Sequence, residues 1–81
     1  MSRVVLITGS SSGIGEATAR HYAAMGDTVV VNSVHSVAAG EKIAADLGGL
    51  YVQGDIALVA DCHRLVESTL SAYGKLDVLV N

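Results

Sequence analysis

Four short apolar runs along the chain predict β-strands. The clearest is Val4-Val5-Leu6-Ile7, because an unbroken series of β-favouring side chains is typical of a strand buried on both faces. Two similar runs follow, at 28–31 and at 76–80. The run at 50–53 is more mixed, which favours a strand at the edge of a sheet. The predicted strands are therefore 3–8, 28–31, 50–53 and 76–80.

The segments between these runs have the periodicity of helices. The predicted helices span 13–25, 37–47 and 58–73, and the glycine that can end each of them is Gly26, Gly48 or Gly74. Ser36 is placed to cap the second helix. The residues near one face of the first helix, which we expect to pack on the sheet, are Ile14, Ala17, Tyr22 and Met25.

The order of these elements predicts an α/β fold. Alternating strands and helices form right-handed crossovers and a parallel sheet, here in the strand order 3-2-1-4 of a Rossmann-type domain. Residues 1–81 would form a single unit of such a domain. The last strand is as apolar as the first, and a bare apolar edge invites aggregation. We therefore expect more chain, or a partner, beside it, and interpret the sequence as the N-terminal part of a domain.

Composition narrows the possible partners. The net charge is −3, and the five basic residues are scattered, so we expect neither nucleic acid nor an acidic membrane as a partner. Apolar runs are too short to span a bilayer, and no signal peptide is visible. The single cysteine, Cys62, has no internal disulfide partner and is expected in the core, which suits a reducing cytoplasm. Three dispersed histidines and one cysteine predict no metal site.

The strongest candidate site is a glycine-rich loop, Thr-Gly-Ser-Ser-Ser-Gly-Ile-Gly at 8–15, between the first strand and the first helix. Such a turn offers free N–H groups and the positive end of the helix dipole to a dinucleotide pyrophosphate. Glycine is needed where a Cβ would block the phosphates or keep the helix off the strand. No Gly-Lys-Ser/Thr follows, which counts against a P-loop hydrolase. The alternative is a tight strand-to-helix connection without a ligand.

Four segments together resemble the short-chain dehydrogenase/reductase family. The loop matches its Thr-Gly-x-x-x-Gly-x-Gly fingerprint, and 13–19 fits its first helix. Gly54-Asp55-Ile56 resembles its aspartate after the third strand, and 76–81 resembles the strand that leads into its Asn-Asn-Ala-Gly motif. The matches occur in order, at family spacing, over nearly the whole chain. The resemblance implies an oxidoreductase that interconverts alcohols and ketones by hydride transfer, with a small carbonyl or alcohol substrate and a homo-oligomeric state.

The resemblance also implies cofactor contacts. Asp55 would accept a hydrogen bond from the adenine amino group, with Ile56 supplying a backbone contact, and Asn81 would lie beside the adenine ribose. The alternative for Asp55 is a solvated turn residue. The loop residues placed around the pyrophosphate and adenosine ribose are Gly9, Ser11, Ser12, Gly13, Ile14 and Gly15.

The end of the second strand bears on the choice between NADP and NAD. An acid there would bind a free ribose 2′-hydroxyl and repel a 2′-phosphate, but this chain has Asn32-Ser33-Val34-His35-Ser36. Asn32, Ser33 and Ser36 can donate to phosphate, and His35 adds charge if protonated. NADP is therefore the expected cofactor and NAD the second choice. No arginine clamps the phosphate, and His35 has the alternative of a solvated loop residue.

The catalytic residues of the family are missing from the sequence. Its tyrosine is followed four residues later by a lysine, but the residues four after Tyr22, Tyr51 and Tyr73 are Gly26, Asp55 and Asp77. We predict that the catalytic serine, tyrosine and lysine lie on later elements, and that these 81 residues alone transfer no hydride. A non-catalytic nucleotide-binding module and a structural half-domain are the competing interpretations. Tyr22 and Tyr73 are expected to pack on the sheet, and His21 and His63 to be exposed.

Overall fold

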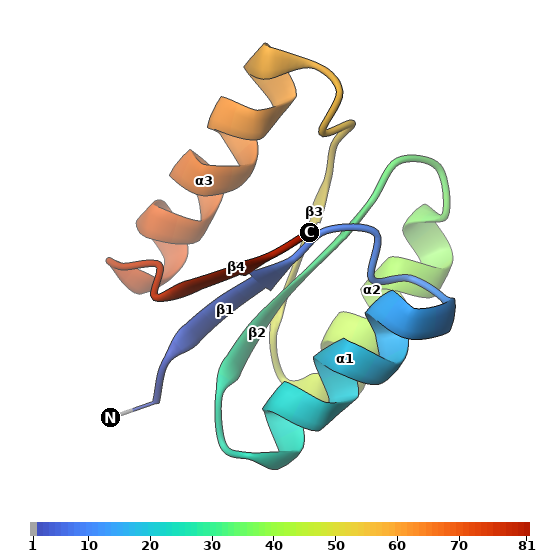
Figure 1. Ribbon diagram of the computed structural model, residues 1–81, viewed down its shortest axis with the longest axis vertical. Helices are drawn as coiled ribbons and strands as arrows, with labels where there is room; N and C mark the ends of the chain where they lie inside the picture. Colours follow the sequence, from blue (N-terminus) through green and yellow to red (C-terminus); the bar gives the residue numbers. More distant parts are fainter. Residues whose placement is uncertain (1) are drawn as a thin grey trace.

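The computed structural model describes residues 2–81 and contains four strands and three helices (Figure 1). In chain order they are β1 (Val4–Ile7), α1 (Gly13–Ala24), β2 (Thr28–Ser33), α2 (Val37–Leu47), β3 (Leu50–Gln53), α3 (Val59–Tyr73) and β4 (Val78–Val80). The bounds of α2 and β3 are those that the sequence predicts, and most other ends differ by one or two residues.

The four strands form one parallel sheet in the order β3-β2-β1-β4. This confirms the predicted α/β topology and places the mixed strand β3 at an edge. Between β1 and β4 the strand order reverses, because β2 and β3 lie on one side of β1 and β4 lies on the other. In open α/β sheets such a switch point is where ligands bind.

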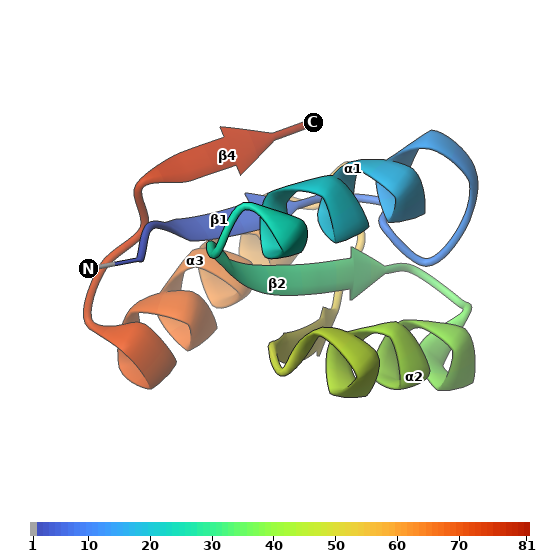
Figure 2. The ribbon, with the colours of Figure 1, turned by 90° about the horizontal axis from the view of Figure 1, so that it is seen from below.

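Side chains of the central strands alternate between two cores. Val5 and Ile7 point to the face covered by α1 and α2, while Val4 and Leu6 point to the face covered by α3. Figure 2 shows α3 on one side of the sheet and the other two helices on the opposite side. Every residue of β1 is buried, which explains why its sequence is a continuous apolar run rather than an alternating one.

The inward face of α1 differs from the predicted one. Ala19 is fully buried, and Tyr22 and Ala23 pack beside it, whereas Ile14 is 87% exposed and Met25 56% exposed. The reason is that small residues face the sheet and let the helix approach it closely. The apolar character of Ile14 and Met25 is therefore a poor guide to their burial.

The helix ends are set by backbone conformation more than by side-chain caps. Gly48 and Gly74 are the left-handed C-caps of α2 and α3, as predicted. Ser36 does occupy the N-cap of α2, but its side chain makes no capping hydrogen bond. That part of the prediction is wrong, because Ser36 has a ψ of 62°, away from the extended conformation typical of a capping residue.

Strand β4 is short and partly exposed on the outer side of β1. Leu79 is 53% exposed, although it pairs with the buried Leu6. The start of the strand is tied to β1 by Asp77, whose Oδ2 accepts a 2.7 Å hydrogen bond from the Val4 N–H. The Val4 amide and the Lys75 ammonium hold the pKa of the Asp77 carboxyl below its usual value.

The tyrosines, the histidines and the cysteine differ in how well their predicted environments agree with the structure. Tyr22 and Tyr73 pack against the two cores, and His21 and His63 are exposed, as predicted. Cys62 is not in the core: it is half-buried, and its thiol donates to the Ile56 carbonyl, 3.1 Å away. Within residues 2–81, no helix combines the length and the apolar character needed to cross a bilayer.

Candidate cofactor-binding site

The glycine loop connects β1 to α1 at the carboxyl edge of the sheet. Two of its glycines, Gly9 with φ of 60° and Gly13 with φ of 58°, have left-handed backbone conformations. Residues other than glycine rarely adopt this conformation. An added Cβ at either position would have no atom within 4 Å, so the space beside them is open. At Gly15, in contrast, a Cβ would overlap the carbonyl oxygen of Gly9. The third glycine therefore lets the first turn of α1 lie directly on the loop.

The first turn of α1 is open to a ligand. Ser12 is the N-cap, in an extended conformation, and its side chain makes no capping hydrogen bond. The helix hydrogen bonds start with Glu16 N–H to the Ser12 carbonyl, 3.2 Å, which leaves the N–H groups of residues 13–15 without acceptors among residues 2–81. Ser11 is half-buried and Ser12 exposed, so their hydroxyls border this turn. Free N–H groups, the helix dipole and room beside two glycines fit a diphosphate.

Ser10 connects β1 to β2 through hydrogen bonds of its hydroxyl, a role that the sequence did not indicate. It is fully buried, and its hydroxyl donates to the Ile7 carbonyl at 2.7 Å and accepts from the Asn32 N–H at 3.0 Å. Of the three serines in the loop, only Ser11 and Ser12 therefore remain for a ligand. The signal that separates them is position: Ser10 directly follows the left-handed Gly9, where the chain turns back over β2.

The residues at the end of β2 separate into a buried pair and an exposed pair. Asn32 and Ser33 are 1% and 4% exposed, and both are hydrogen-bonded within the fold. The Ser33 hydroxyl lies 2.6 Å from the Tyr51 hydroxyl, an interaction that sequence reasoning missed. His35 and Ser36 are exposed at the start of α2. Because Asn32 and Ser33 are buried, they are not placed to donate to a 2′-phosphate as expected. His35 and Ser36 remain as candidates for that contact.

The turn after β3 carries Asp55 and Ile56. The Asp55 carboxylate accepts a 2.9 Å hydrogen bond from the Ala57 N–H through Oδ1, and its own N–H donates to Asp61. This is the turn geometry that we considered as the alternative role of Asp55. The two roles are compatible, because Oδ2 has no hydrogen-bond partner in the part of the chain that the structure describes. Ile56 is 47% exposed.

A pocket of about 190 Å³ brings two of the predicted residues together at the switch point. Ile56 and Asn81 both line it, together with Thr8 at the end of β1. The Thr8 hydroxyl donates to the Asn81 Oδ1 at 3.2 Å, which joins the ends of β1 and β4. The exposed pair at the start of α2 does not line this pocket. The predicted residues therefore form three groups around the carboxyl edge: the loop, the start of α2, and the switch-point pocket.

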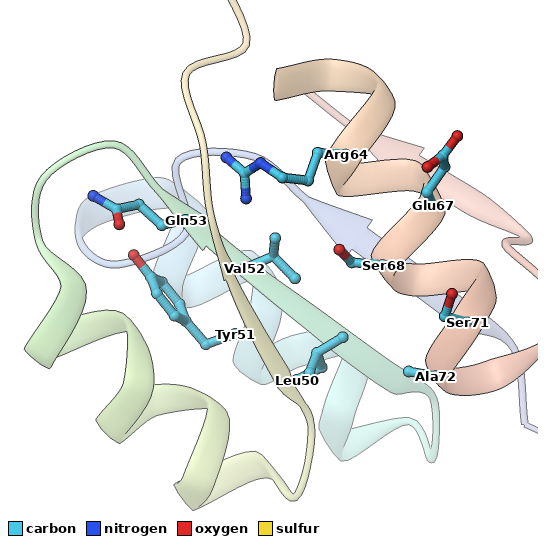
Figure 3. Close-up of a pocket in the computed structure, with 9 residues that line it drawn as sticks. All are labelled: Leu50, Tyr51, Val52, Gln53, Arg64, Glu67, Ser68, Ser71 and Ala72. Atoms are coloured by element: carbon cyan, nitrogen blue, oxygen red, sulfur yellow. The ribbon is translucent and has the colours of Figure 1, made fainter. Parts of the chain in front are cut away.

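A wider groove of about 710 Å³ lies between the free edge of β3 and α3 (Figure 3). Figure 3 shows polar side chains of α3, including Arg64 and Ser68, on one side of it and β3 on the other. None of the predicted cofactor residues lines this groove. Among residues 2–81, no group of three or more metal-ligating side chains comes together either. The carboxyl edge of the sheet is therefore the candidate site.

Comparison with known proteins agrees with this geometry. The family model described as short chain dehydrogenase matches residues 3–81, which includes the loop, the turn after β3 and β4. The chain belongs to the short-chain dehydrogenase family. The resemblance seen in the four sequence segments is thus confirmed over nearly all of the chain.

Relatives within the short-chain dehydrogenase family are oxidoreductases. The chain is 56% identical over 79 residues to the "Granaticin polyketide synthase putative ketoacyl reductase 2" of Streptomyces violaceoruber, covering 96% of this chain and 32% of that protein. It is 40% identical to the 3-oxoacyl-[acyl-carrier-protein] reductase of Synechocystis (99% and 34%) and 39% identical to the mitochondrial borneol dehydrogenase of Lavandula x intermedia (98% and 30%). The chain spans about a third of the length of these curated relatives.

Proposed function

We propose that this chain forms the NAD(P)-binding part of an oxidoreductase. The observation that carries the proposal is the open first turn of α1, which lies on the Gly9 carbonyl and presents three N–H groups that have no acceptors within residues 2–81. The N–H groups of residues 13–15 and the hydroxyls of Ser11 and Ser12 would hold the pyrophosphate. Several N–H donors that converge at a helix start suit the two adjacent negative charges of a diphosphate.

The remaining contacts are proposed for the adenine side. Asp55 has one carboxylate oxygen available to accept from the adenine amino group, and Ile56 lies beside it in the same turn. Asn81 would contact the adjoining ribose, close to the end of β1. Each of these residues follows the carboxyl end of β3 or β4, and the glycine loop leaves the same edge of the parallel sheet at the end of β1.

The proposed reaction is the interconversion of a carbonyl and an alcohol. When bound, the nicotinamide supplies or accepts the hydride of this conversion. The names of the relatives include a ketoacyl reductase, a 3-oxoacyl-[acyl-carrier-protein] reductase and a borneol dehydrogenase, so a ketoacyl thioester is the first substrate to test. We place the catalytic serine, tyrosine and lysine beyond residue 81, since no tyrosine here has a lysine four residues later. We also propose that the complete protein is a homo-oligomer and that it is located in the cytoplasm.

Titration of the complete protein with NADPH and NADH, followed by turnover assays with ketoacyl substrates, tests the function. Saturable binding and cofactor-dependent reduction are the expected results. Binding without turnover of any carbonyl or alcohol would instead support a non-catalytic nucleotide-binding module. If neither dinucleotide bound, the chain would serve as a structural half-domain, and the proposal would be refuted.

We propose NADP as the preferred cofactor. The exposed start of α2 carries His35 and Ser36, has no acid in its first turn, and lacks a side-chain cap. A 2′-phosphate there would meet the positive end of a helix of 11 residues and no repelling carboxylate. His35→Asp adds such a carboxylate and should lower the ratio of NADP to NAD affinity roughly tenfold.

The matched control is Ala45→Asp, which adds the same charge at an exposed position near the far end of α2. Both variants are titrated with both dinucleotides. The control should leave the affinity ratio unchanged. An equal change in the two variants would show a general charge effect, and tighter binding of NAD by the unmodified protein would reverse the preference.

A further inference from the structure

Asn32 occupies an unusual place at the end of β2, because its side-chain amide is buried and all its hydrogen-bond partners among residues 2–81 are main-chain atoms. The side chain is 1% exposed. Its Oδ1 accepts from the Gly9 N–H at 3.1 Å, and its Nδ2 donates to the carbonyls of Val52 and Gly54, each at 3.1 Å. One amide thus touches the glycine loop on one side and the end of β3, with the turn that follows, on the other.

The main chain of Asn32 strengthens the link to the loop. Its carbonyl accepts from the Ser10 N–H at 2.8 Å, and its N–H donates to the Ser10 hydroxyl at 3.0 Å. The loop residues directly after β1 are therefore held by both the backbone and the side chain of Asn32. Gly9 is one of the two glycines of the loop with a left-handed conformation, so the amide contacts the loop where the chain changes direction.

From these contacts we infer that Asn32 is a positioning residue that fixes the loop proposed for the pyrophosphate relative to the turn proposed for adenine. The inference rests on the proposed function. Gly54 directly precedes Asp55. The hydrogen bond from the Asn32 Nδ2 to the Gly54 carbonyl therefore fixes the position of the backbone that carries the Asp55 carboxylate. In this arrangement Asn32 does not contact the ligand. It is enclosed between the glycine loop and the turn after β3, which are the segments proposed to contact it.

The chemistry of the contacts specifies an amide. The site requires one acceptor for the Gly9 N–H and two donors for the carbonyls of Val52 and Gly54. An ionised aspartate has the same shape but no donor, so it would face two carbonyl oxygens with a buried negative charge. Protonation would restore one of the two donors. Asn32→Asp should therefore disturb the site at high pH more than at low pH.

The test measures dissociation constants for NADPH and NADH at pH 5.5 and pH 8 in the complete protein. In Asn32→Asp we expect at least tenfold weaker binding at pH 8 and a smaller loss at pH 5.5. The control is Thr69→Ala in α3, which also removes a buried polar group, the hydroxyl bonded to the Leu65 carbonyl at 2.8 Å. It should lower stability to unfolding and leave both dissociation constants and their pH dependence unchanged.

The outcomes separate the inference from the function it rests on. If the unmodified protein binds neither dinucleotide, the proposed function fails. If it binds and Asn32→Asp binds equally well at both pH values, or if Thr69→Ala shows the same pH-dependent loss, the positioning role is refuted. Should Asn32→Asp not fold, amide hydrogen exchange of Gly9 in the unmodified protein decides: slow exchange supports the inference, and exchange at the rate of a free peptide overturns it.

Discussion

Gly15 is the position where one methyl group should do most harm to the site. A Cβ added there would overlap the Gly9 carbonyl oxygen, so Gly15→Ala forces α1 and the loop apart. The loop cannot easily retreat, because Gly9 and Ser10 are both hydrogen-bonded to Asn32. The variant is otherwise favourable, since alanine is a better helix former than glycine and Gly15 has no positive φ.

The magnitude follows from these opposing terms. Alanine in a helix interior gains about 0.5–1 kcal/mol over glycine. Overpacking typically costs about 1–3 kcal/mol, and the cost should be near the upper end here because the Cβ meets backbone rather than a side chain that can rotate away. We therefore expect Gly15→Ala to reduce the free energy of unfolding by about 2–2.5 kcal/mol. Dinucleotide affinity should fall at least tenfold, because the helix start moves from the loop.

Gly13→Asn is the informative comparison. Gly13 has a left-handed φ of 58° and open space around it, and asparagine tolerates this conformation better than most residues. Its side chain would fill the space proposed for the phosphates. Urea unfolding and dinucleotide titration of both variants should show lost stability and affinity in Gly15→Ala, but mainly lost affinity in Gly13→Asn. A stable Gly15→Ala variant with unchanged affinity would refute the argument from close packing.

Two further predictions concern packing and pH. Gly40→Ala places a methyl group on the Tyr51 ring, so it should destabilise the protein but become neutral or favourable in a Tyr51→Ala background, and a double-mutant cycle by urea unfolding measures this coupling. Additive effects would contradict it. The hydrogen bond from Arg3 lowers the pKa of Asp27, so this pair stabilises the fold above the usual aspartate pKa, and the contribution is lost as pH falls through the lowered value. Asp27→Asn should flatten the acid limb of stability between pH 5 and pH 2, and an unchanged limb would show that the pair contributes nothing.

Most of the fold could be predicted from the sequence because its elements are short, regular and bounded by glycine. The apolar runs of β1 and β2 have no alternation, which indicates burial on both faces, and the alternation with helices fixes a parallel sheet. The inward face of α1 was predicted incorrectly because Ile14 is apolar but exposed, while the buried Ala19 gives a weak signal. The face of this helix that meets the sheet carries Ala19, Tyr22 and Ala23, and the hydrophobicity of Ile14 and Met25 does not reveal it.

The site was predicted less completely than the fold. The positions of the loop glycines follow from their spacing, but the division of labour among polar residues does not. Asn32 and Ser10 have the chemistry of ligand-binding residues, yet burial directs their hydrogen bonds to the backbone. A polar residue that closes an all-apolar strand is the signal that could have suggested this for Asn32. The contact between Tyr51 and Ser33 joins residues 18 positions apart and depends on strand register.

The bare start of α1 has a consequence for the lifetime of the protein. If a dinucleotide binds as proposed to the N–H groups of residues 13–15, which have no acceptors among residues 2–81, it would bind the folded chain but not the unfolded one. Binding would then raise the free energy of unfolding, by roughly 2.7 kcal/mol when the dinucleotide is present at a hundred times its dissociation constant. Proteolysis in the cell should then be slow while the dinucleotide pool is full and accelerate when it is depleted, so abundance would follow metabolic state without any separate sensor.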